Sequence, residues 1–550
     1  MSQIIECVPN FSEGQDLGII EQITDAIQTV EGVKLLNVDA GKATNRTVVT
    51  IVGEPNAVID AAFRAIKKAG ELIDMTRHKG EHPRIGATDV CPLIPIANIS
   101  MEETAAYAQQ LARRVGEELN LPVYLYEAAQ PNKDRSSLSV IRNGEYEGMA
   151  SKILLPEWKP DFGPAIFDKQ RGATVIGARD FLVAYNINLN TTSTRRANAI
   201  AFDVREAGRN VEEKGVKINK PGSLKFVKAI GWYIQEYGIA QISINLTNIN
   251  ITPVHIAFDE VCEKAAARGI RVTGSELVGL IPLQSMLDAG KYFLEKQQRS
   301  IGVSEEELIK IAVKSMGLDE LRPFKAEERI IEYLLASDAS NKLVNMTLAN
   351  FADETASESP APGGGSIAAY VGALGVSLAG MVANLSAHKK GWDHRWQEFS
   401  QWAVKAQELK SDLLKLVDED TAAFNGMMSA FALPKGNESE KKIRDEAIQL
   451  ATKAAMEVPY KVMLASHASM KIVKAMAEGG NPNSVSDAGV GALCARTAVM
   501  GAFLNVRINA AGYHNKKEVE ILLEKGRAIE KAATEEEALI LAMVNEKIGL

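Results

Sequence analysis

Residues 4–52 of the chain, IIECVPNFSEGQDLGIIEQITDAIQTVEGVKLLNVDAGKATNRTVVTIV, alternate between short apolar runs and a longer amphipathic stretch. Short apolar runs are typical of buried strands, whereas isoleucines three and four residues apart, as in Ile20, Ile23 and Ile27, indicate one face of a helix. The expected strands are 4–8, 33–38, 47–52, 90–96 and 123–126, and the expected helices are 19–27, 57–73 and 101–119. The core order is therefore β-α-β-β-α-β.

The same order of elements recurs after residue 174. The expected strands there are 182–189, 226–233, 239–246 and 275–281, with helices at 194–207 and 254–268. This order is the split β-α-β arrangement of ferredoxin-like sheets. Two such subdomains side by side are expected to leave a groove between their sheets, where ligands commonly bind.

The last third of the chain, after a loop rich in Ser, Pro and Gly at 357–365, is expected to form a helical bundle. Residues 367–387 carry no charge and are long enough to cross a bilayer, but they are rich in Ala, Gly and Ser, which insert weakly. We therefore expect a buried helix and no membrane partner. Further helices, with apolar residues three and four apart, are expected at 392–433, 438–478, 484–509 and 516–546.

The expected fold class is an α+β N-terminal part, made of two ferredoxin-like βαββαβ subdomains, followed by an all-α helical bundle domain. A chain of 550 residues is too long for one hydrophobic core, so several domains are required. The expected boundaries are 1–178 for the first subdomain, 179–326 for the second, 327–342 for a helical linker and 343–550 for the bundle domain.

Composition and charge exclude several classes of function. Sixty-two basic and 70 acidic side chains give a net charge of −8, which provides no overall attraction for nucleic acid. The four cysteines are scattered without metal-ligand spacing, as expected for buried thiols in a reducing compartment. Acidic residues and Pro9 interrupt the first apolar run, so we expect no signal peptide and a cytoplasmic location.

Two histidines and a carboxylate lie within five positions in His78-Lys79-Gly80-Glu81-His82. Zinc proteases need H-E-x-x-H on an unbroken helix, whereas the order differs here and Gly80 and Pro83 interrupt a helix. No metal is therefore expected. A histidine in a polar loop before an apolar strand suits proton transfer near neutral pH, and it equally suits a structural cap of the strand.

The runs Val8-Pro9-Asn10-Phe11-Ser12-Glu13-Gly14 and His82-Pro83-Arg84-Ile85-Gly86-Ala87-Thr88-Asp89 resemble glutamate formimidoyltransferases, and their separation fits that family. The family transfers a formimino group from N-formimino-L-glutamate to tetrahydrofolate, without a metal or a nucleotide. The resemblance places His82 on the catalytic histidine. Its implied role is to take the proton from the attacking N5 of tetrahydrofolate, after which a tetrahedral intermediate expels glutamate.

The resemblance also implies residues that bind the substrates. Arg46, Arg84 and Lys79 would bind carboxylates of formiminoglutamate or folate, because a guanidinium matches a carboxylate with two hydrogen bonds; a solvated charge is the alternative. Asp39 either positions a folate nitrogen or ends a strand. The family's folate-binding loop, which could also be a plain linker, matches Gly163, Pro164, Ala165, Ile166, Phe167, Asp168, Lys169, Gln170, Arg171 and Gly172.

The last third resembles formimidoyltetrahydrofolate cyclodeaminases in the runs 362–366 (PGGGS), 418–424 (DEDTAAF) and 483–489 (NSVSDAG). In their reaction N10 attacks the formimino carbon and ammonia leaves, giving 5,10-methenyltetrahydrofolate. The departing nitrogen needs a proton, and the match assigns this step to Asp420, with Asp418 and Asp487 as alternatives. The expected folate-binding residues here are Gly363, Gly364 and Gly365, whose N–H groups suit a carboxylate, and Asp487.

Together the two resemblances cover nearly the whole chain, which is thus similar to the bifunctional formimidoyltransferase-cyclodeaminases of histidine degradation. The implied partners are formiminoglutamate and folates, with tetrahydrofolate, expected to be polyglutamylated, as co-substrate. The family also implies a homo-oligomer, a ring-shaped octamer. Two alternatives stay open: a C-terminal domain like methenyltetrahydrofolate cyclohydrolase, and a non-catalytic folate-binding scaffold.

Overall fold

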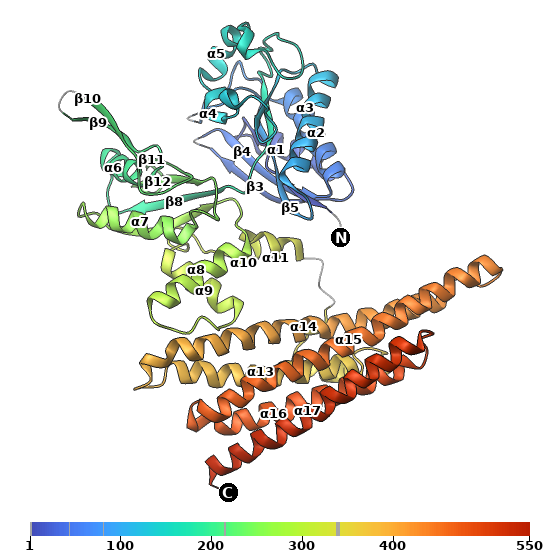
Figure 1. Ribbon diagram of the computed structural model, residues 1–550. Helices are drawn as coiled ribbons and strands as arrows, with labels where there is room; N and C mark the ends of the chain where they lie inside the picture. The colour runs from blue at the N-terminus through green and yellow to red at the C-terminus, as the bar shows by residue number, and fades with distance from the viewer. Residues whose placement is uncertain (1–2, 43, 81, 214–215, 337–341, 550) are drawn as a thin grey trace. The chain divides into compact units, whose positions relative to one another are not determined.

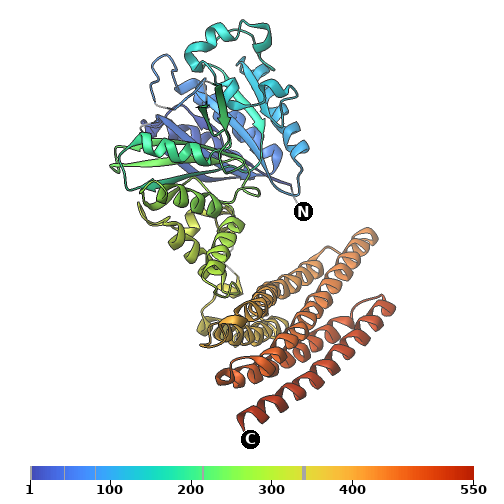
Figure 2. The ribbon, with the colours of Figure 1, turned by 60° about the vertical axis from the view of Figure 1, so that its left-hand side comes forward.

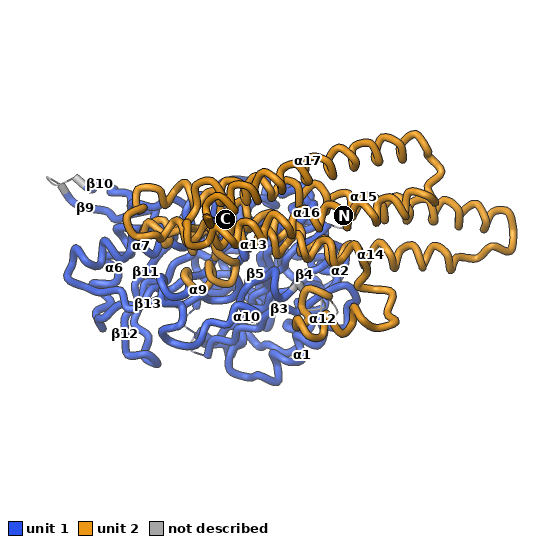
Figure 3. Tube along the Cα trace, turned by 90° about the horizontal axis from the view of Figure 1, so that it is seen from below, with its two compact units in different colours: residues 1–285, 313–335 blue, residues 286–312, 336–550 orange. Residues whose placement is uncertain are grey.

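The computed structural model describes residues 3–42, 44–80, 82–213, 216–336 and 342–549. The chain divides into two compact units (Figure 3). Unit 1 comprises residues 1–285 and 313–335, and unit 2 comprises residues 286–312 and 336–550. In their described parts, unit 1 is α+β and unit 2 is helical, as expected.

Unit 1 begins with a seven-stranded sheet (Figure 1). Its strands are β1 (Ile4–Cys7), β2 (Asn10–Phe11), β3 (Val33–Gly41), β4 (Arg46–Gly53), β5 (Thr88–Ala97), β6 (Val123–Glu127) and β7 (Thr174–Ala178). Both β1 and β2 lie between β4 and β5, and β3 pairs with β4. These pairs are antiparallel, whereas β7 and then β6 extend the sheet from β5 in parallel.

One face of this sheet packs against the core helices α1 (Leu17–Gln28), α2 (Pro55–Leu72) and α3 (Met101–Glu118). Alternate strand residues, such as Ile5 and Val49, are buried in this core. Side chains alternate along a strand, so the polar residues Glu6, Asn10 and Arg46 lie on the opposite face. That second face holds the first candidate site.

Two short helices, α4 (Leu138–Ile141) and α5 (Glu145–Lys152), cover part of the second face. Ile141 and Met149 form a small core there with Tyr124 and Val175. The remaining part of the face carries the polar side chains.

The second sheet of unit 1 has the strand order β11-β12-β8-β13 and is antiparallel throughout. Its strands are β8 (Val183–Leu189), β11 (Val227–Ile234), β12 (Ile239–Leu246) and β13 (Val272–Val278), and its helices are α6 (Thr194–Val204) and α7 (Val254–Ala266). A separate hairpin of β9 (Arg209–Glu213) and β10 (Val216–Lys220) was not expected from the sequence. The expected strands and helices of both sheets are confirmed, with ends that differ by a few residues.

The segment after the second sheet is helical, as expected for a connection. It contains α8 (Leu283–Lys296), α9 (Glu305–Met316), α10 (Ala326–Arg329) and α11 (Ile331–Ala336). Most of α8 and α9 belongs to unit 2, where Gly302 in the loop between them packs against α14, with its carbonyl accepting hydrogen bonds from Asn384 and Gln407.

Long helices run alongside one another in unit 2 (Figures 1 and 2). They are α13 (Gly364–Ala387), α14 (Trp396–Ala432), α15 (Glu438–Gly479), α16 (Val485–Ala510) and α17 (Lys516–Ile548), preceded by the short α12 (Leu348–Thr355). The expected helices are confirmed; Pro434 lies between α14 and α15, and Pro482 lies between α15 and α16. Pro459 lies inside α15 without ending it.

The uncharged helix α13 packs against α14, α15 and α16. Small residues permit this close approach, since a Cβ atom at Gly372 would lie 2.5 Å from Ser466 Oγ and one at Gly375 would lie 2.9 Å from Cys494 Cβ. The helix α13 and the stretch 482–510 are both long and apolar enough to span a membrane, but 61% of the most apolar window of α13 is buried. The expectation of a buried bundle helix fits this packing.

Candidate active sites

The two sequence runs that resemble transferases lie side by side in unit 1. Ser12 Oγ donates a hydrogen bond to the Gly86 carbonyl at 2.7 Å, and the Ser12 N–H donates to the Ala87 carbonyl at 2.9 Å. Asn45 joins the same region, since its Oδ1 accepts from the Gly14 N–H at 3.0 Å and its Nδ2 donates to the Lys79 carbonyl at 2.9 Å. The loop that carries His82 is therefore fixed against the end of β2 and the start of β4.

His82 is partly buried beside two guanidinium groups. Burial, and after it the positive charges of Arg46 and Arg142, lower the pKa of His82 from 6.5 to about 3. The imidazole is therefore uncharged at neutral pH. Within the described residues its Nδ1 atom is buried and makes no hydrogen bond.

Arg46 lies on the same polar face of the first sheet as Asn10. Its Nη2 donates to Asn10 Oδ1, while its Nε is buried and has no partner among the described residues. Burial, together with the charge of Arg142, lowers the pKa of Arg46 to about 10, so this guanidinium still carries its charge at neutral pH. The arrangement suits the binding of an anion.

Asp39, the second predicted polar residue of this face, is half-buried on β3. It is opposite Val48, which is itself opposite Asn10 on the next strand. Its carboxylate stabilises the charges of Arg46 and of Arg322, a residue that follows the second sheet. Asp39 thus lies where the first sheet approaches residues of the second subdomain.

Arg84 lies two residues from His82 but is already paired. Its guanidinium makes two hydrogen bonds to Glu147, at 2.6 and 2.9 Å, and one to Glu145 at 3.1 Å. Its Nε donates to His78 Nδ1 at 3.2 Å. The sequence suggested that Arg84 binds a substrate carboxylate, but in the structure its guanidinium is already paired with protein carboxylates. Lys79 is exposed, in keeping with the solvated alternative.

The predicted folate loop, 163–172, ends beside the His82 loop. The Ala87 N–H donates to the Arg171 carbonyl at 2.8 Å, and the Ala173 N–H donates to the Ile85 carbonyl at 3.0 Å. Asp168 and Arg171 form an ion pair at 2.7 Å within the loop. Ile166 is 71% exposed, so the loop presents an apolar side chain to solvent.

Sequence reasoning missed several polar residues of this face. Asp89, almost fully buried, forms an ion pair with Arg142. Burial raises the pKa of Glu6 to about 7, and the nearby Arg179 opposes this shift. Arg179 also hydrogen bonds to the buried Tyr126. The only signal for Glu6 was a carboxylate within a strand that is otherwise apolar.

The second candidate site lies in unit 2, where α13 begins. Ser366 Oγ lies 2.9 Å from Asp420 Oδ2, and the Ser366 N–H also donates to this carboxylate. A Cβ atom at Gly365 would lie 2.1 Å from Asp420 Oδ1, so the carboxyl group contacts the glycine backbone directly. The structure thus brings together the glycine run and Asp420, which the sequence proposed separately.

Asp420 is mostly buried, and burial raises its pKa above 3.8, although the two hydrogen bonds from Ser366 oppose the shift. Ser366 Oγ also lies 3.1 Å from the Val417 carbonyl. A hydroxyl group has one hydrogen, so it donates either to ionised Asp420 or to Val417, and in the second case it can accept from protonated Asp420. Both protonation states of Asp420 can therefore be accommodated.

The two alternative carboxylates lie elsewhere. Asp418 Oδ1 accepts a hydrogen bond from the Leu343 N–H at 2.8 Å and so fixes the chain that enters unit 2. Asp487 lies in the first turn of α16, whereas Asn505, near its other end, contacts Gly364. A rise of about 1.5 Å per residue places Asp487 roughly 27 Å from Asn505 along the helix axis. Within one chain, Asp487 is therefore not part of the Asp420 site.

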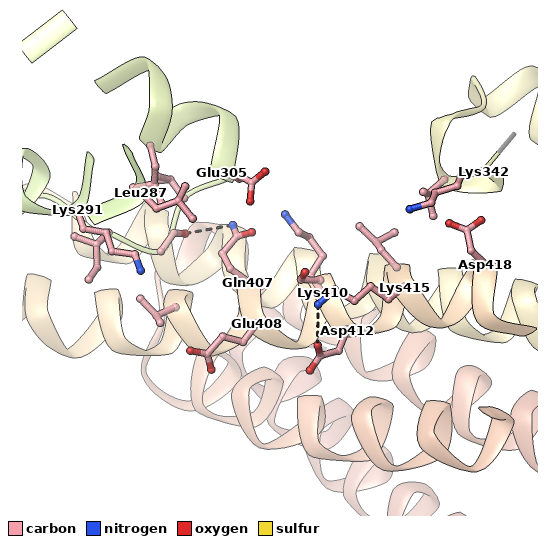
Figure 4. A pocket seen from close by; sticks show the side chains of 18 of the residues that line it. Leu287, Lys291, Glu305, Lys342, Gln407, Glu408, Lys410, Asp412, Lys415 and Asp418 are labelled. Atoms are coloured by element: carbon pink, nitrogen blue, oxygen red, sulfur yellow. Dashed lines mark hydrogen bonds and ion pairs between the residues drawn. The ribbon is translucent and has the colours of Figure 1, made fainter. Parts of the chain in front are cut away.

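A cavity of about 1220 Å³ in unit 2 lies between the loop before α9, α14 and the segment after residue 342 (Figure 4). Four lysines line it, Lys291, Lys342, Lys410 and Lys415, together with five carboxylates. Opposite charges therefore nearly balance, and the cavity has no net positive charge for a polyanion.

Comparison with known proteins identifies the family of the chain. Family models match in three consecutive segments: the N-terminal subdomain of the formiminotransferase domain at 4–179, the formiminotransferase domain at 184–336, and formiminotransferase-cyclodeaminase at 347–528. A formimidoyltransferase-cyclodeaminase from Gallus gallus is 43% identical over 549 residues, with both chains covered completely. The chain belongs to the formimidoyltransferase-cyclodeaminase family.

Two further relatives each match only one part of this chain. A glutamate formimidoyltransferase from Thermoplasma acidophilum is 45% identical over 53% of this chain and 92% of its own length. A methenyltetrahydrofolate cyclohydrolase from Methylorubrum extorquens is 36% identical over 34% of this chain and 92% of its own length. The Methylorubrum extorquens relative is named for a different reaction from that of the full-length relatives.

Proposed function

We propose that this chain transfers the formimino group from N-formimino-L-glutamate to tetrahydrofolate and then cyclises 5-formiminotetrahydrofolate to 5,10-methenyltetrahydrofolate with release of ammonia. The similarity to bifunctional relatives over the full length supports both reactions. The observation that carries the proposal is the pair of separate sites: an uncharged His82 beside two arginines, and Asp420 at the start of α13. Neither reaction requires a metal or a nucleotide.

In the first reaction, N5 of tetrahydrofolate attacks the formimino carbon and His82 accepts the N5 proton. The tetrahedral intermediate then collapses, and the amino group of glutamate leaves with a proton. Uncharged His82 has the correct protonation state for a base, but a pKa of about 3 makes it a weak one. We propose that binding of the substrate raises the pKa of His82.

Formiminoglutamate carries two carboxylates, and Arg46 and Arg142 are the charges that lower the pKa of His82. A carboxylate bound to Arg46 would offset this positive charge and raise the pKa of His82 towards neutrality. The unpaired Nε of Arg46 provides a donor for it. His82 would thus become an effective base only when the substrate is bound.

In the second reaction, N10 attacks the formimino carbon and the departing nitrogen takes a proton to leave as ammonia. We assign that proton to Asp420, because burial raises its pKa and so favours the protonated form more than in an exposed carboxyl group. Ser366 holds the carboxyl group in place in both protonation states.

The loop at 163–172, Asp39 and the N–H groups of Gly363, Gly364 and Gly365 are proposed to contact the folate. The exposed apolar side chain of Ile166 next to the His82 loop supports a pteridine or aminobenzoyl contact there. A polyglutamate tail on the folate and a homo-oligomer in the form of a ring-shaped octamer are proposals carried by the family resemblance. A cytoplasmic location is proposed because the scattered cysteines suit a reducing compartment.

Both sheets of unit 1 are proposed to be ferredoxin-like. The order β11-β12-β8-β13, antiparallel throughout, supports this description of the second sheet. The first sheet has the same order, with β3 and β4 followed by β1 and β5, and is extended by β7 and β6.

The second candidate function is a cyclohydrolase in the helical part, which the similarity to the Methylorubrum extorquens protein favours. The cyclodeaminase and cyclohydrolase functions are distinguished by supplying the full chain with 5-formiminotetrahydrofolate alone and, separately, with 5,10-methenyltetrahydrofolate alone. Ammonia released from 5-formiminotetrahydrofolate supports the cyclodeaminase, whereas no ammonia, with conversion of 5,10-methenyltetrahydrofolate to 10-formyltetrahydrofolate, supports the cyclohydrolase. Absence of every turnover, with folate still bound, would support a non-catalytic scaffold.

A further inference from the structure

The segment 142–147 comprises the turn after α4 and the first residues of α5. It contacts the His82 loop at two points. It contains no residue singled out by the sequence runs, and the proposed chemistry uses only the positive charge of Arg142. Its contacts nevertheless converge on the stretch from residue 82 to residue 89.

The first point of contact is Asp89. Arg142 donates to both of its carboxylate oxygens, through Nε to Oδ1 at 3.3 Å and through Nη2 to Oδ2. The Ile85 N–H donates to the same Oδ1 at 3.0 Å. The Asp89 side chain is only 2% exposed, so one buried carboxylate joins Arg142 to the backbone three residues after His82.

The second point of contact is Arg84. Glu147 receives two hydrogen bonds from its guanidinium, and Glu145 receives one. The Tyr146 N–H donates to the Arg84 carbonyl at 2.8 Å, and the Arg84 guanidinium lies 5.9 Å from the centre of the Tyr146 ring. Both the backbone and the side chain of Arg84 are thereby held.

The backbone of the segment makes these contacts possible. Gly144 and Glu145 have φ angles of 89° and 52°, in the left-handed region that a glutamate rarely adopts. The resulting turn lets Arg142, before it, and Glu147, after it, contact the same loop.

We propose that the 142–147 segment positions His82 for proton transfer, with Arg142 acting through Asp89 and Glu147 acting through Arg84. The inference rests on the proposed role of His82. Because no described residue bonds to Nδ1 of His82, the direction of its ring depends on the backbone around it. Arg142 and Glu147 are positioning residues in this account, since neither is required to touch the reacting atoms.

A purely structural role for Glu147 predicts a lower melting temperature when its charge is lost, whereas a positioning role does not. The Glu147 side chain is 64% exposed, and the buried Arg84 guanidinium keeps its ion pair with Glu145 when Glu147 loses its charge. Loss of its charge should therefore leave the melting temperature almost unchanged. A reacting group that shifts by about 1 Å, by contrast, can lose roughly 100-fold in rate.

The test is Glu147→Gln in the full chain, with Glu157→Gln as its matched control, because Glu157 is exposed and makes no side-chain ion pair among the described residues. For Glu147→Gln we expect the kcat of transfer to fall roughly 10-fold, with the KM for formiminoglutamate changed by less than about 2-fold. Ammonia release from supplied 5-formiminotetrahydrofolate should equal that of the wild type. Glu157→Gln should match the wild type in both assays.

An unchanged kcat for Glu147→Gln would overturn the inference, and so would a loss of kcat that accompanies a lower melting temperature. Arg142→Lys provides a second test, since it keeps a positive charge beside Asp89 but loses the two-point geometry; it should also lower kcat with little change in KM. Transfer retained by His82→Ala would instead overturn the proposed role of His82 itself, and the positioning inference with it.

Discussion

Ser366 on α13 and Asp420 on α14 are joined by two hydrogen bonds, one from the serine hydroxyl at 2.9 Å and one from its backbone N–H. The carboxyl group therefore lies against the first turn of α13, in contact with Gly365. This relationship makes the chemistry of Asp420 sensitive to changes in two neighbouring residues.

Gly365→Ala should remove most of the cyclodeaminase activity. The added Cβ atom would lie 2.1 Å from Asp420 Oδ1, so the carboxyl group must move. Gly426→Ala is the matched control, because Gly426 lies on α14 like Asp420 and no atom of the described residues beyond its own stretch of helix lies within 4 Å of the position of its Cβ. Ammonia release from 5-formiminotetrahydrofolate measures both, and equal rates for the two variants would contradict the geometry.

Ser366→Ala should shift the pH dependence of cyclisation. The hydrogen bonds from Ser366 lower the pKa of Asp420, so loss of the hydroxyl group should raise this pKa further. If protonated Asp420 is the acid, kcat for cyclisation falls as rising pH removes its proton. In Ser366→Ala this fall should occur at higher pH than in the wild type. A shift to lower pH would exclude Asp420 as the acid.

His82 should remain uncharged in the free protein well below pH 6.5, and its pKa should rise when formiminoglutamate binds. The physical reason is that bound carboxylates offset the charges of Arg46 and Arg142. The measurement is an NMR titration of the imidazole C–H signals, with His82→Gln used to assign the resonance. A pKa near 6.5 that substrate does not change would contradict the proposed coupling.

The same shift predicts an effect on stability. The pKa of His82 is lower in the folded chain than its ordinary value, so the unfolded chain binds the extra proton on acidification. The free energy of unfolding of unit 1 therefore falls as pH decreases from 6.5 towards about 3. His82→Gln should lose stability less steeply over this range in denaturant unfolding, and an equal slope would count against the buried, uncharged histidine.

Much of the fold could be predicted because it depends on local periodicity. The strands around Ile5 and Val49 and the helix through Ile23 follow directly from the spacing of apolar residues. The hairpin β9–β10 was missed, because its strands are mostly polar and their sequences offer no continuous apolar face. The strand β2 has two residues, too few for a periodic pattern.

The candidate sites were predictable only in part. His82 and Asp420 were identified through resemblance, since each alone also suits a structural role. The sequence could not show that Arg84 pairs with Glu147, or that Asp89 pairs with Arg142, because these partners lie more than 50 positions apart along the chain. In a sequence, a charged residue next to a histidine proposed as catalytic suggests a substrate ligand. Only the fold shows that such a residue is already paired with another residue of the protein.

In the proposed mechanism one chain holds two independent sites, at His82 and at Asp420. The most direct test supplies formiminoglutamate and tetrahydrofolate to wild type, His82→Ala and Asp420→Ala, and follows 5,10-methenyltetrahydrofolate by its absorbance and ammonia by a coupled assay. We predict that His82→Ala blocks transfer but still cyclises supplied 5-formiminotetrahydrofolate, and that Asp420→Ala accumulates 5-formiminotetrahydrofolate without releasing ammonia. Full activity of either variant in the step assigned to it, or loss of both steps in one correctly folded variant, would contradict the account.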